Sequence, residues 1–251
     1  MYMRFKLLVH DKAGFTLIEG IIATGIIGTA LVVGLSLAIA NLSAAQTNSD
    51  RILAGQLARE GIEVVRNMRD SNWLRREASI DIDGTGAVEF YTWDDIFEGW
   101  PILNTGACGG DCYGNYFDVI LTDPDLATSG YKYTLKKVTA NPADVLLCIG
   151  DAGQPSCRVY ERSGVYHQKS SEPTSEDRAT FYYRRIILNP ICWDATAETE
   201  VVESTVDMLC NEVAGHTEKI GMLVTSHVVW QRSTKTLEVR IKERMYNWRT
   251  P

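Results

Sequence analysis

The residues with the most distinctive chemistry in this chain are its six cysteines, which all lie after residue 100 of 251. An even number of cysteines at short spacings is typical of a disulfide-bonded domain in an oxidising compartment. Six cysteines allow 15 connectivities. We favour sequential pairing, which predicts the local bonds Cys108–Cys112, Cys148–Cys157 and Cys192–Cys210. The alternative is a metal site. It finds little support, because no C-x-x-C pair occurs and His167, His216 and His227 are scattered.

A second candidate for metal chemistry is the acidic loop Asp81–Gly86. Asp81, Asp83 and Thr85 stand at positions 1, 3 and 5 of a calcium loop, with Gly86 at the sharp turn. The twelfth position, however, is Thr92 instead of a bidentate glutamate. We therefore favour a plain Asp-Gly hairpin turn over a calcium site.

Catalytic chemistry is not predicted. The chain has no H-E-x-x-H, no G-x-S-x-G and no phosphate-binding loop, so we expect no enzyme and no cofactor. His227 lies in an expected strand, where it would face solvent or the edge of a core. Four aromatic residues fit either a binding surface or a core: Trp100, Tyr182, Tyr183 and Trp193.

One glutamate has unusual surroundings. No charged residue occurs in the 30 positions between Glu19 and Asp50, which are mostly apolar. About 20 apolar residues span the core of a bilayer, so this stretch predicts a membrane helix. A carboxylate in or beside such a helix is costly and is usually functional. Arg4, Lys6 and Lys12 precede the helix, which predicts a cytoplasmic N-terminus.

A secretory signal peptide is the competing interpretation, with a small-residue cleavage site between Ala38 and Ala45. An apolar stretch of this length is too long for a signal peptide, so the membrane helix is favoured.

The formal net charge of −7 and a pI near 5.2 provide no basic surface of the kind that nucleic acids bind. We therefore expect no nucleic-acid partner.

These residues must be positioned by a long helix and a β-rich domain. No proline precedes Pro101, so the chain from Phe15 to about Asn72 can form one continuous helix. Apolar and small residues then recur at helical spacing after Asp50 and predict an amphipathic second half. These are Ala54, Leu57, Gly61, Val64 or Val65, and Met68.

The remainder of the chain has a sequence pattern typical of β-structure. Strands are expected at 88–93, 116–121, 131–138 and 158–161, followed by three stronger runs. These runs are "TFYYRRIIL", "KIGMLVTSHVVWQ" and "KTLEVRIKERMYNW", the last two joined as a hairpin by "RSTK". The predicted class is therefore α+β. A long N-terminal helix packs on one face of a C-terminal antiparallel sheet whose other face is polar.

The membrane half of the helix also carries small residues four positions apart. Gly20, Thr24 and Gly28 form one such series, and Gly34 belongs to a second. This spacing lets helices approach closely in lipid, so we expect helix–helix packing along it.

The N-terminal stretch "KAGFTLIEGIIATGIIGTALVVG" resembles the prepilin N-terminus of type IV pilins and type II secretion pseudopilins. The matching residues are Gly14, Phe15, Thr16, Leu17, Ile18, Glu19 and the "IIG" that ends at Gly28. The resemblance implies four segments: a cytoplasmic leader over 1–14 that is removed, a transmembrane half-helix over 15–49, an amphipathic half-helix over 50–74, and an extracytoplasmic domain over 75–251.

The resemblance also implies how the chain is processed and assembled. Prepilin peptidase would cut between Gly14 and Phe15, Phe15 would be N-methylated, and its amine would pair with Glu19 of a neighbouring subunit. The implied partners are this peptidase, other pilin or pseudopilin subunits, an inner-membrane assembly platform and the lipid bilayer. The implied location is a single pass of the inner membrane, with the N-terminus cytoplasmic, and then a filament or the cell surface.

A minor subunit is the favoured position. The segment "AREGIEVVRNMRDSNW", with "VVWQ" and "YNWR", is similar to minor pilins of the PilV kind. Many pilins have a proline near the middle of the membrane helix, where Ser36 stands here. The alternative is a membrane-anchored adhesin or binding protein that does not enter a filament.

Overall fold

The structure is a computed structural model of the chain. It describes residues 14, 16–75, 79–80, 89–90, 95–97, 100–101, 116–121, 133–137, 145–149, 157–168, 174–202, 210 and 216–246. The chain divides into two compact units, Met1–Asp50 and Arg51–Pro251.

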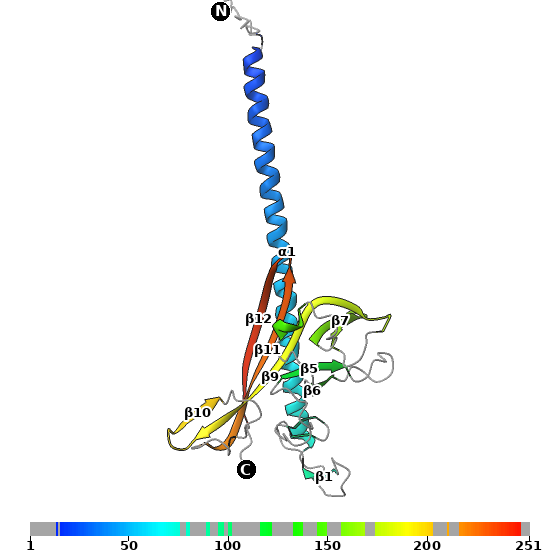
Figure 1. The fold of residues 1–251 in the computed structure, drawn as a ribbon, viewed down its shortest axis with the longest axis vertical. Coiled ribbons are helices and arrows are strands. Elements are labelled where there is room, and N and C mark those ends of the chain that lie inside the picture. Colours follow the sequence, from blue (N-terminus) through cyan, green and yellow to red (C-terminus); the bar gives the residue numbers. More distant parts are fainter. Residues whose placement is uncertain are drawn as a thin grey trace, which may run out of the picture. The chain divides into compact units, whose positions relative to one another are not determined.

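The helix α1 spans Leu17–Arg75, 59 residues, and contributes to both units (Figure 1). It begins after Thr16, whose carbonyl oxygen accepts hydrogen bonds from the N–H groups of Glu19 and Gly20 at 3.1 and 3.2 Å. The absence of proline leaves every later turn free to form its backbone bonds. The prediction of one long N-terminal helix is thereby confirmed.

The second unit contains an antiparallel sheet of eight strands among the described residues. Its main path runs in the order β12, β11, β9, β5, β6, while β10 and β7 pair with β9, and β8 pairs with β7. The strands are β5 Tyr116–Leu121, β6 Tyr133–Lys137, β7 Arg158–Arg162, β8 Val165–His167, β9 Arg178–Asp194, β10 Thr199–Val202, β11 His216–Arg232 and β12 Lys235–Tyr246.

The described residues also include two small ribbons, in which β1 pairs with β2 and β3 pairs with β4, and one 3₁₀ turn, η1, which follows β6 and precedes β7 in the sequence. Their bounds are β1 Ser79–Ile80, β2 Glu89–Phe90, β3 Asp95–Phe97, β4 Trp100–Pro101 and η1 Val145–Cys148. The fold is the predicted α+β arrangement of a long helix packed on an antiparallel sheet.

The hairpin of β11 and β12 forms where "RSTK" predicts it. Arg232 pairs with Lys235, so Ser233 and Thr234 make a two-residue turn. Ser233 has a φ of 55°, in the left-handed region that tight hairpin turns require. Because the turn fixes the register, the apolar residues of β11 at even positions share one face.

The core lies between α1 and that face of the sheet. One cluster joins Ala54, Leu57 and Ala58 of α1 to Tyr182, Val228 and Trp230, and includes Val159. A second joins Ile62, Val64 and Val65 to Val119, Leu135, Ile186, Leu188, Met222, Val224 and Met245. The predicted amphipathic stripe is therefore the buried one, with Ala58 and Ile62 as further members.

The opposite face of the sheet differs from the prediction. We expected it to be polar and solvated, but Arg185 of β9 and Thr225, His227 and Val229 of β11 are all buried there. Only β12 keeps the predicted alternation, with Glu238, Arg240 and Lys242 exposed. Contacts of η1 with both β9 and β11 contribute to this cover. The central strands are thus buried on both faces, which an alternating pattern alone does not indicate.

Gly61 marks a close approach of α1 to the sheet. A Cβ atom placed on Gly61 would lie 2.5 Å from Cδ1 of Ile186 and 2.7 Å from Oγ of Ser226. Gly55, six residues earlier in the same helix, has open space around it. The missing side chain at Gly61 therefore sets the distance at which the helix packs.

We predict that Gly61→Ala lowers the free energy of unfolding by about 1–3 kcal/mol, because a buried contact must open to admit the methyl group. The matched control Gly55→Ala gains helix propensity without a clash and should stabilise by about 0.5–1 kcal/mol. Urea unfolding of the detergent-solubilised chain measures both values. A Gly61→Ala variant as stable as Gly55→Ala would contradict this account of the helix–sheet contact.

Candidate functional site

The first candidate site is the start of α1. Gly14 is exposed and has open space around its Cα atom, while Phe15 lies outside the described residues. The helix begins only at Leu17, so Gly14 precedes the first helical turn. A backbone that is exposed and outside regular structure is accessible to a protease.

Glu19 lies in the first turn of α1 and its side chain is exposed. A carboxylate there is favoured by the unpaired N–H groups of the helix N-terminus. Within the part of the chain that the structure describes, Glu19 has no ion-pair partner. The described part of the chain therefore places this carboxylate at the start of the apolar stretch without a basic side chain beside it.

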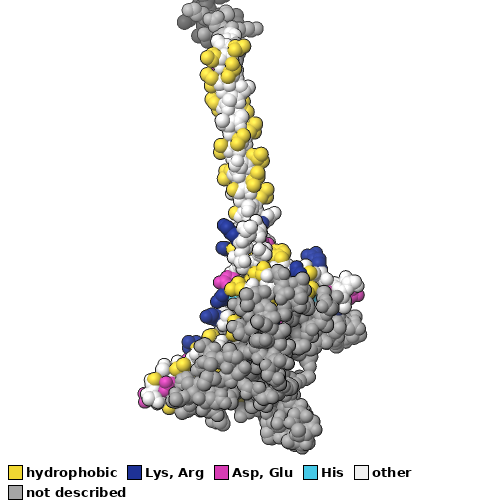
Figure 2. Space-filling model, in the orientation of Figure 1, with side chains coloured by type: hydrophobic (Ala, Val, Ile, Leu, Met, Phe, Trp, Pro, Cys, Tyr) yellow, Lys and Arg dark blue, Asp and Glu magenta, His cyan; other side chains and the backbone are white. Residues whose placement is uncertain are grey.

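The apolar part of α1 is long enough and apolar enough to cross a membrane. The candidate span, Leu17–Ser71, reaches a mean hydropathy of 2.2, and none of its most apolar window is buried. Figure 2 shows apolar side chains along the length of this part of the helix. The large ones between Leu17 and Leu42 are 55% to 84% exposed. Such a surface needs an apolar environment, either lipid or other helices.

Hydroxyl groups in this segment bond to the backbone of their own helix. Thr24 Oγ1 donates to the carbonyl of Gly20 at 2.9 Å, Thr29 Oγ1 to that of Gly25 at 3.1 Å, and Ser36 Oγ to that of Val32 at 2.9 Å. Each hydroxyl is thereby satisfied without water, as an apolar environment requires. The helix continues through Ser36 without a break.

The predicted helix-packing residues lie along the same exposed surface. Gly20, Gly28 and Gly34 have open space around them. Their packing against a second helix is not tested by a single chain and stays a prediction.

Two of the three predicted disulfides are present. Cys148 is bonded to Cys157 and Cys192 to Cys210, and all four residues are buried. The predicted Cys108–Cys112 pair lies outside the described residues, as do Asp81, Asp83 and Thr85 of the calcium alternative. No group of metal-ligating side chains occurs among the residues that are described.

The remaining candidates from the sequence belong mostly to the interior. His227 was expected to face solvent or the edge of a core. It is buried, which rules out the solvent-facing position, and its Nε2 atom lies 2.9 Å from Oε2 of Glu238. Tyr182 is a core residue whose ring packs against Trp230. Tyr183 is half-buried beneath the guanidinium of Arg158, which lies 5.7 Å from the ring centre.

The structure also contains a buried ionic cluster that the sequence did not predict. Arg162 donates to Oδ1 of Asp177 at 2.9 Å, and Nε2 of His167 lies 3.2 Å from the same oxygen. Thr174 donates its N–H and its hydroxyl to Oδ2 at 2.7 and 2.8 Å. The Asp177 side chain is fully buried. This cluster ties the segment before β9 to the β7–β8 hairpin.

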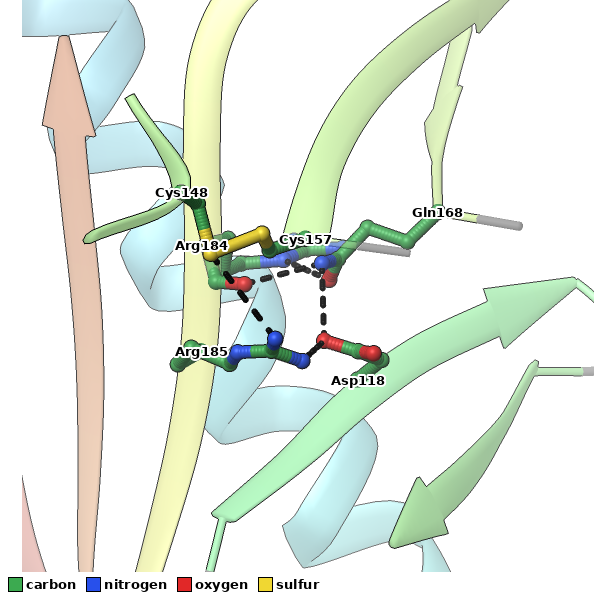
Figure 3. The surroundings of a disulfide bond; sticks show 6 residues. All are labelled: Asp118, Cys148, Cys157, Gln168, Arg184 and Arg185. Carbon is green, nitrogen blue, oxygen red and sulfur yellow. Dashed lines mark hydrogen bonds and ion pairs between the residues drawn. A yellow bond between two sulfur atoms is a disulfide. The ribbon is translucent and has the colours of Figure 1, made fainter. Parts of the chain in front are cut away.

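The sequence also did not predict a buried network around two arginines. Arg184 and Arg185, adjacent on β9, are both fully buried and bonded to Gln168 and Asp118 respectively (Figure 3). Two adjacent arginines in a strand normally indicate that at least one meets solvent, so the sequence carries no signal for this site.

Comparisons of the chain with protein-family models, with curated proteins and with solved structures gave no match. The site is therefore defined by the geometry of its own residues.

Stability should fall in mild acid because of His167. Burial lowers the pKa of His167 below its ordinary value of 6.5, and this effect outweighs the attraction of Asp177. The unfolded chain then binds a proton more readily than the folded one. The contribution of His167 is fully present above pH 6.5 and is lost as the pH falls below that value. We predict a lower melting temperature at pH 5.5 than at pH 7.5, and a smaller difference in His167→Gln. An unchanged difference in that variant would contradict the assignment.

Proposed function

We propose that this chain is a structural subunit, in a minor position, of a type IV pilus or of a related secretion pseudopilus. The observation that carries the proposal is the arrangement at the start of α1. An exposed glycine precedes the helix, and one carboxylate stands in the first turn of an exposed apolar segment. The sequence "GFTLIEG" supplies the residue types that prepilin processing requires.

Processing gives the carboxylate a role. Hydrolysis of the Gly14–Phe15 bond releases the leader and leaves a new amine on Phe15, which is N-methylated. This ammonium and the Glu19 carboxylate both carry a high cost in lipid when each is alone. Pairing the ammonium of one subunit with Glu19 of its neighbour removes both costs in one register, so assembly is favoured over the isolated subunit.

The length of the chain and the residue at position 36 support a minor position. Removal of residues 1–14 from 251 leaves 237, which is long for a main fibre subunit. Ser36 replaces the mid-helix proline of many pilins, and α1 is unbroken there. The subunit would enter through the inner membrane with its leader cytoplasmic and its β-domain outside. It would meet the peptidase and the assembly platform there.

The mature N-terminus should begin at N-methylated Phe15. Mass spectrometry of the protein from filament-producing cells measures this directly, and Gly14→Ala, which adds a side chain at the cleaved bond, should leave the leader attached. Wild-type protein that retains Met1 would rule out the pilin proposal and leave an anchored adhesin or binding protein.

Glu19→Gln keeps the size of the side chain but removes its charge, so we predict normal membrane insertion and a loss of filament incorporation of roughly tenfold or more, as expected for an unpaired charge in lipid. The matched control is Glu198→Gln, an exposed glutamate in the β-domain. Immunoblots of sheared filaments and of membranes report the two steps. Normal incorporation of Glu19→Gln would remove the pairing mechanism while leaving processing intact.

A further inference from the structure

The disulfide Cys148–Cys157 lies beside a network of buried polar contacts between Arg184, Arg185, Gln168 and Asp118 (Figure 3). Arg184 extends this network to α1. The network includes Arg184 and Arg185, which are neighbours on β9. Successive side chains of a strand point to opposite faces of a sheet, so these two guanidinium groups connect the two faces. Both are fully buried, and a buried charge is tolerated only where partners hold it.

On the helix side, Arg184 contacts α1. Its Nη1 atom donates to the carbonyl oxygen of Leu57 at 3.0 Å and lies 3.2 Å from Oε2 of Glu60. The carbonyl of Leu57 is also the expected acceptor for the N–H of Gly61 in the helix ladder. Arg184 therefore fastens the turn of α1 that packs closely on the sheet.

On the opposite face, Arg185 forms an ion pair with Asp118 of β5 through its Nη1 atom. Its Nη2 atom lies 3.8 Å from the Sγ atom of Cys148. The bond to Cys157 holds Cys148, at the end of η1, next to the first residues of β7. The disulfide thus fixes Cys148 beside Arg185 and its ion pair.

Gln168, directly after β8, joins the two arginines. Its Nε2 atom donates to Oδ1 of Asp118 at 3.3 Å and to the carbonyl of Arg184 at 2.8 Å. Its Oε1 atom accepts from Nε of Arg184 at 3.1 Å. Gln168 is also held by Val119, whose N–H donates to its Oε1 atom at 3.1 Å. Gln168 therefore couples Arg184 to the Asp118–Arg185 pair.

We propose that formation of Cys148–Cys157 is the step that locks the second half of α1 onto the sheet. In the reduced chain, η1 keeps its contacts with β9 and β11 but loses its covalent link to Cys157, so the Asp118–Arg185 pair can hydrate. Gln168 then loses its fixed contact with Asp118, its hold on Arg184 loosens, and the helix turn around Leu57 is less firmly fastened. In the oxidised chain the network is closed.

The chemistry of the lock is a thiol–disulfide exchange with a disulfide donor of the oxidising compartment. The two thiols lose two protons and two electrons and form one S–S bond, while the donor's S–S bond breaks to give two thiols. A chain still in a reducing compartment would keep α1 unlocked, so helix fastening follows export. This inference does not require that the chain enter a filament.

The test is hydrogen exchange of the backbone amides of residues 57–65 in the full chain, purified in detergent. Cys148→Ala/Cys157→Ala should lower their protection by roughly tenfold or more, as for a local opening. The matched control is Cys192→Ala/Cys210→Ala. That bond closes a separation of 18 residues against 9, so its loss costs at least as much chain entropy. The control should leave residues 57–65 protected. Equal loss in both variants, or none in the first, would overturn the proposal.

A second measurement uses the wild-type chain, which decides the matter even if the first variant does not fold. Mixtures of reduced and oxidised glutathione set the redox state, and alkylation with mass spectrometry gives the oxidised fraction of each cysteine pair. Protection of residues 57–65 should follow the oxidation of Cys148–Cys157. Protection that follows only Cys192–Cys210, or neither pair, would overturn the lock. Because filament incorporation is not measured, failure here is distinct from failure of the proposed function.

Discussion

The packing of α1 at Gly61 against Ile186 and Ser226 is the constraint on which the second unit depends. Only a residue without a side chain lets the helix come this close, and the apolar residues on both sides of it then meet β9 and β11. Their burial is what makes a single helix an integral part of a sheet domain, because non-directional apolar packing supplies most of the stabilisation. Polar contacts such as Arg184 to Leu57 add orientation to this packing.

The same helix presents two different surfaces along its length. From Ala54 to Val65 its apolar residues are buried against strands, whereas from Leu17 to Leu42 they are exposed all round. The first pattern is an amphipathic stripe and the second is typical of a membrane segment. The change between the two patterns falls where the uncharged stretch ends, at Asp50 and Arg51.

The sequence predicted the elements whose signal is local. The proline-free helix, the alternating strands β11 and β12, and two short-range disulfides follow from patterns within about 20 residues. Arg184 and Arg185 do not, because their burial needs Gln168, Asp118 and η1, which come from separate segments. The sequence left open whether His227 faces solvent or the edge of a core for a similar reason, since its burial depends on cover from other segments. At the candidate site, Glu19 is conspicuous in the sequence, whereas the bonds of Thr24 and Ser36 to their own helix are visible only in the structure.

The strand β12 lies at the end of the sheet's main path, and among the described residues it pairs only with β11. Along it, exposed Glu238, Arg240 and Lys242 alternate with half-buried apolar residues. Charges on a terminal strand disfavour the addition of a foreign strand, which is the first step of β-aggregation. The charged side chains of β12 therefore disfavour edge-to-edge pairing between the sheets of two copies, whereas the exposed apolar part of α1 carries no such charges.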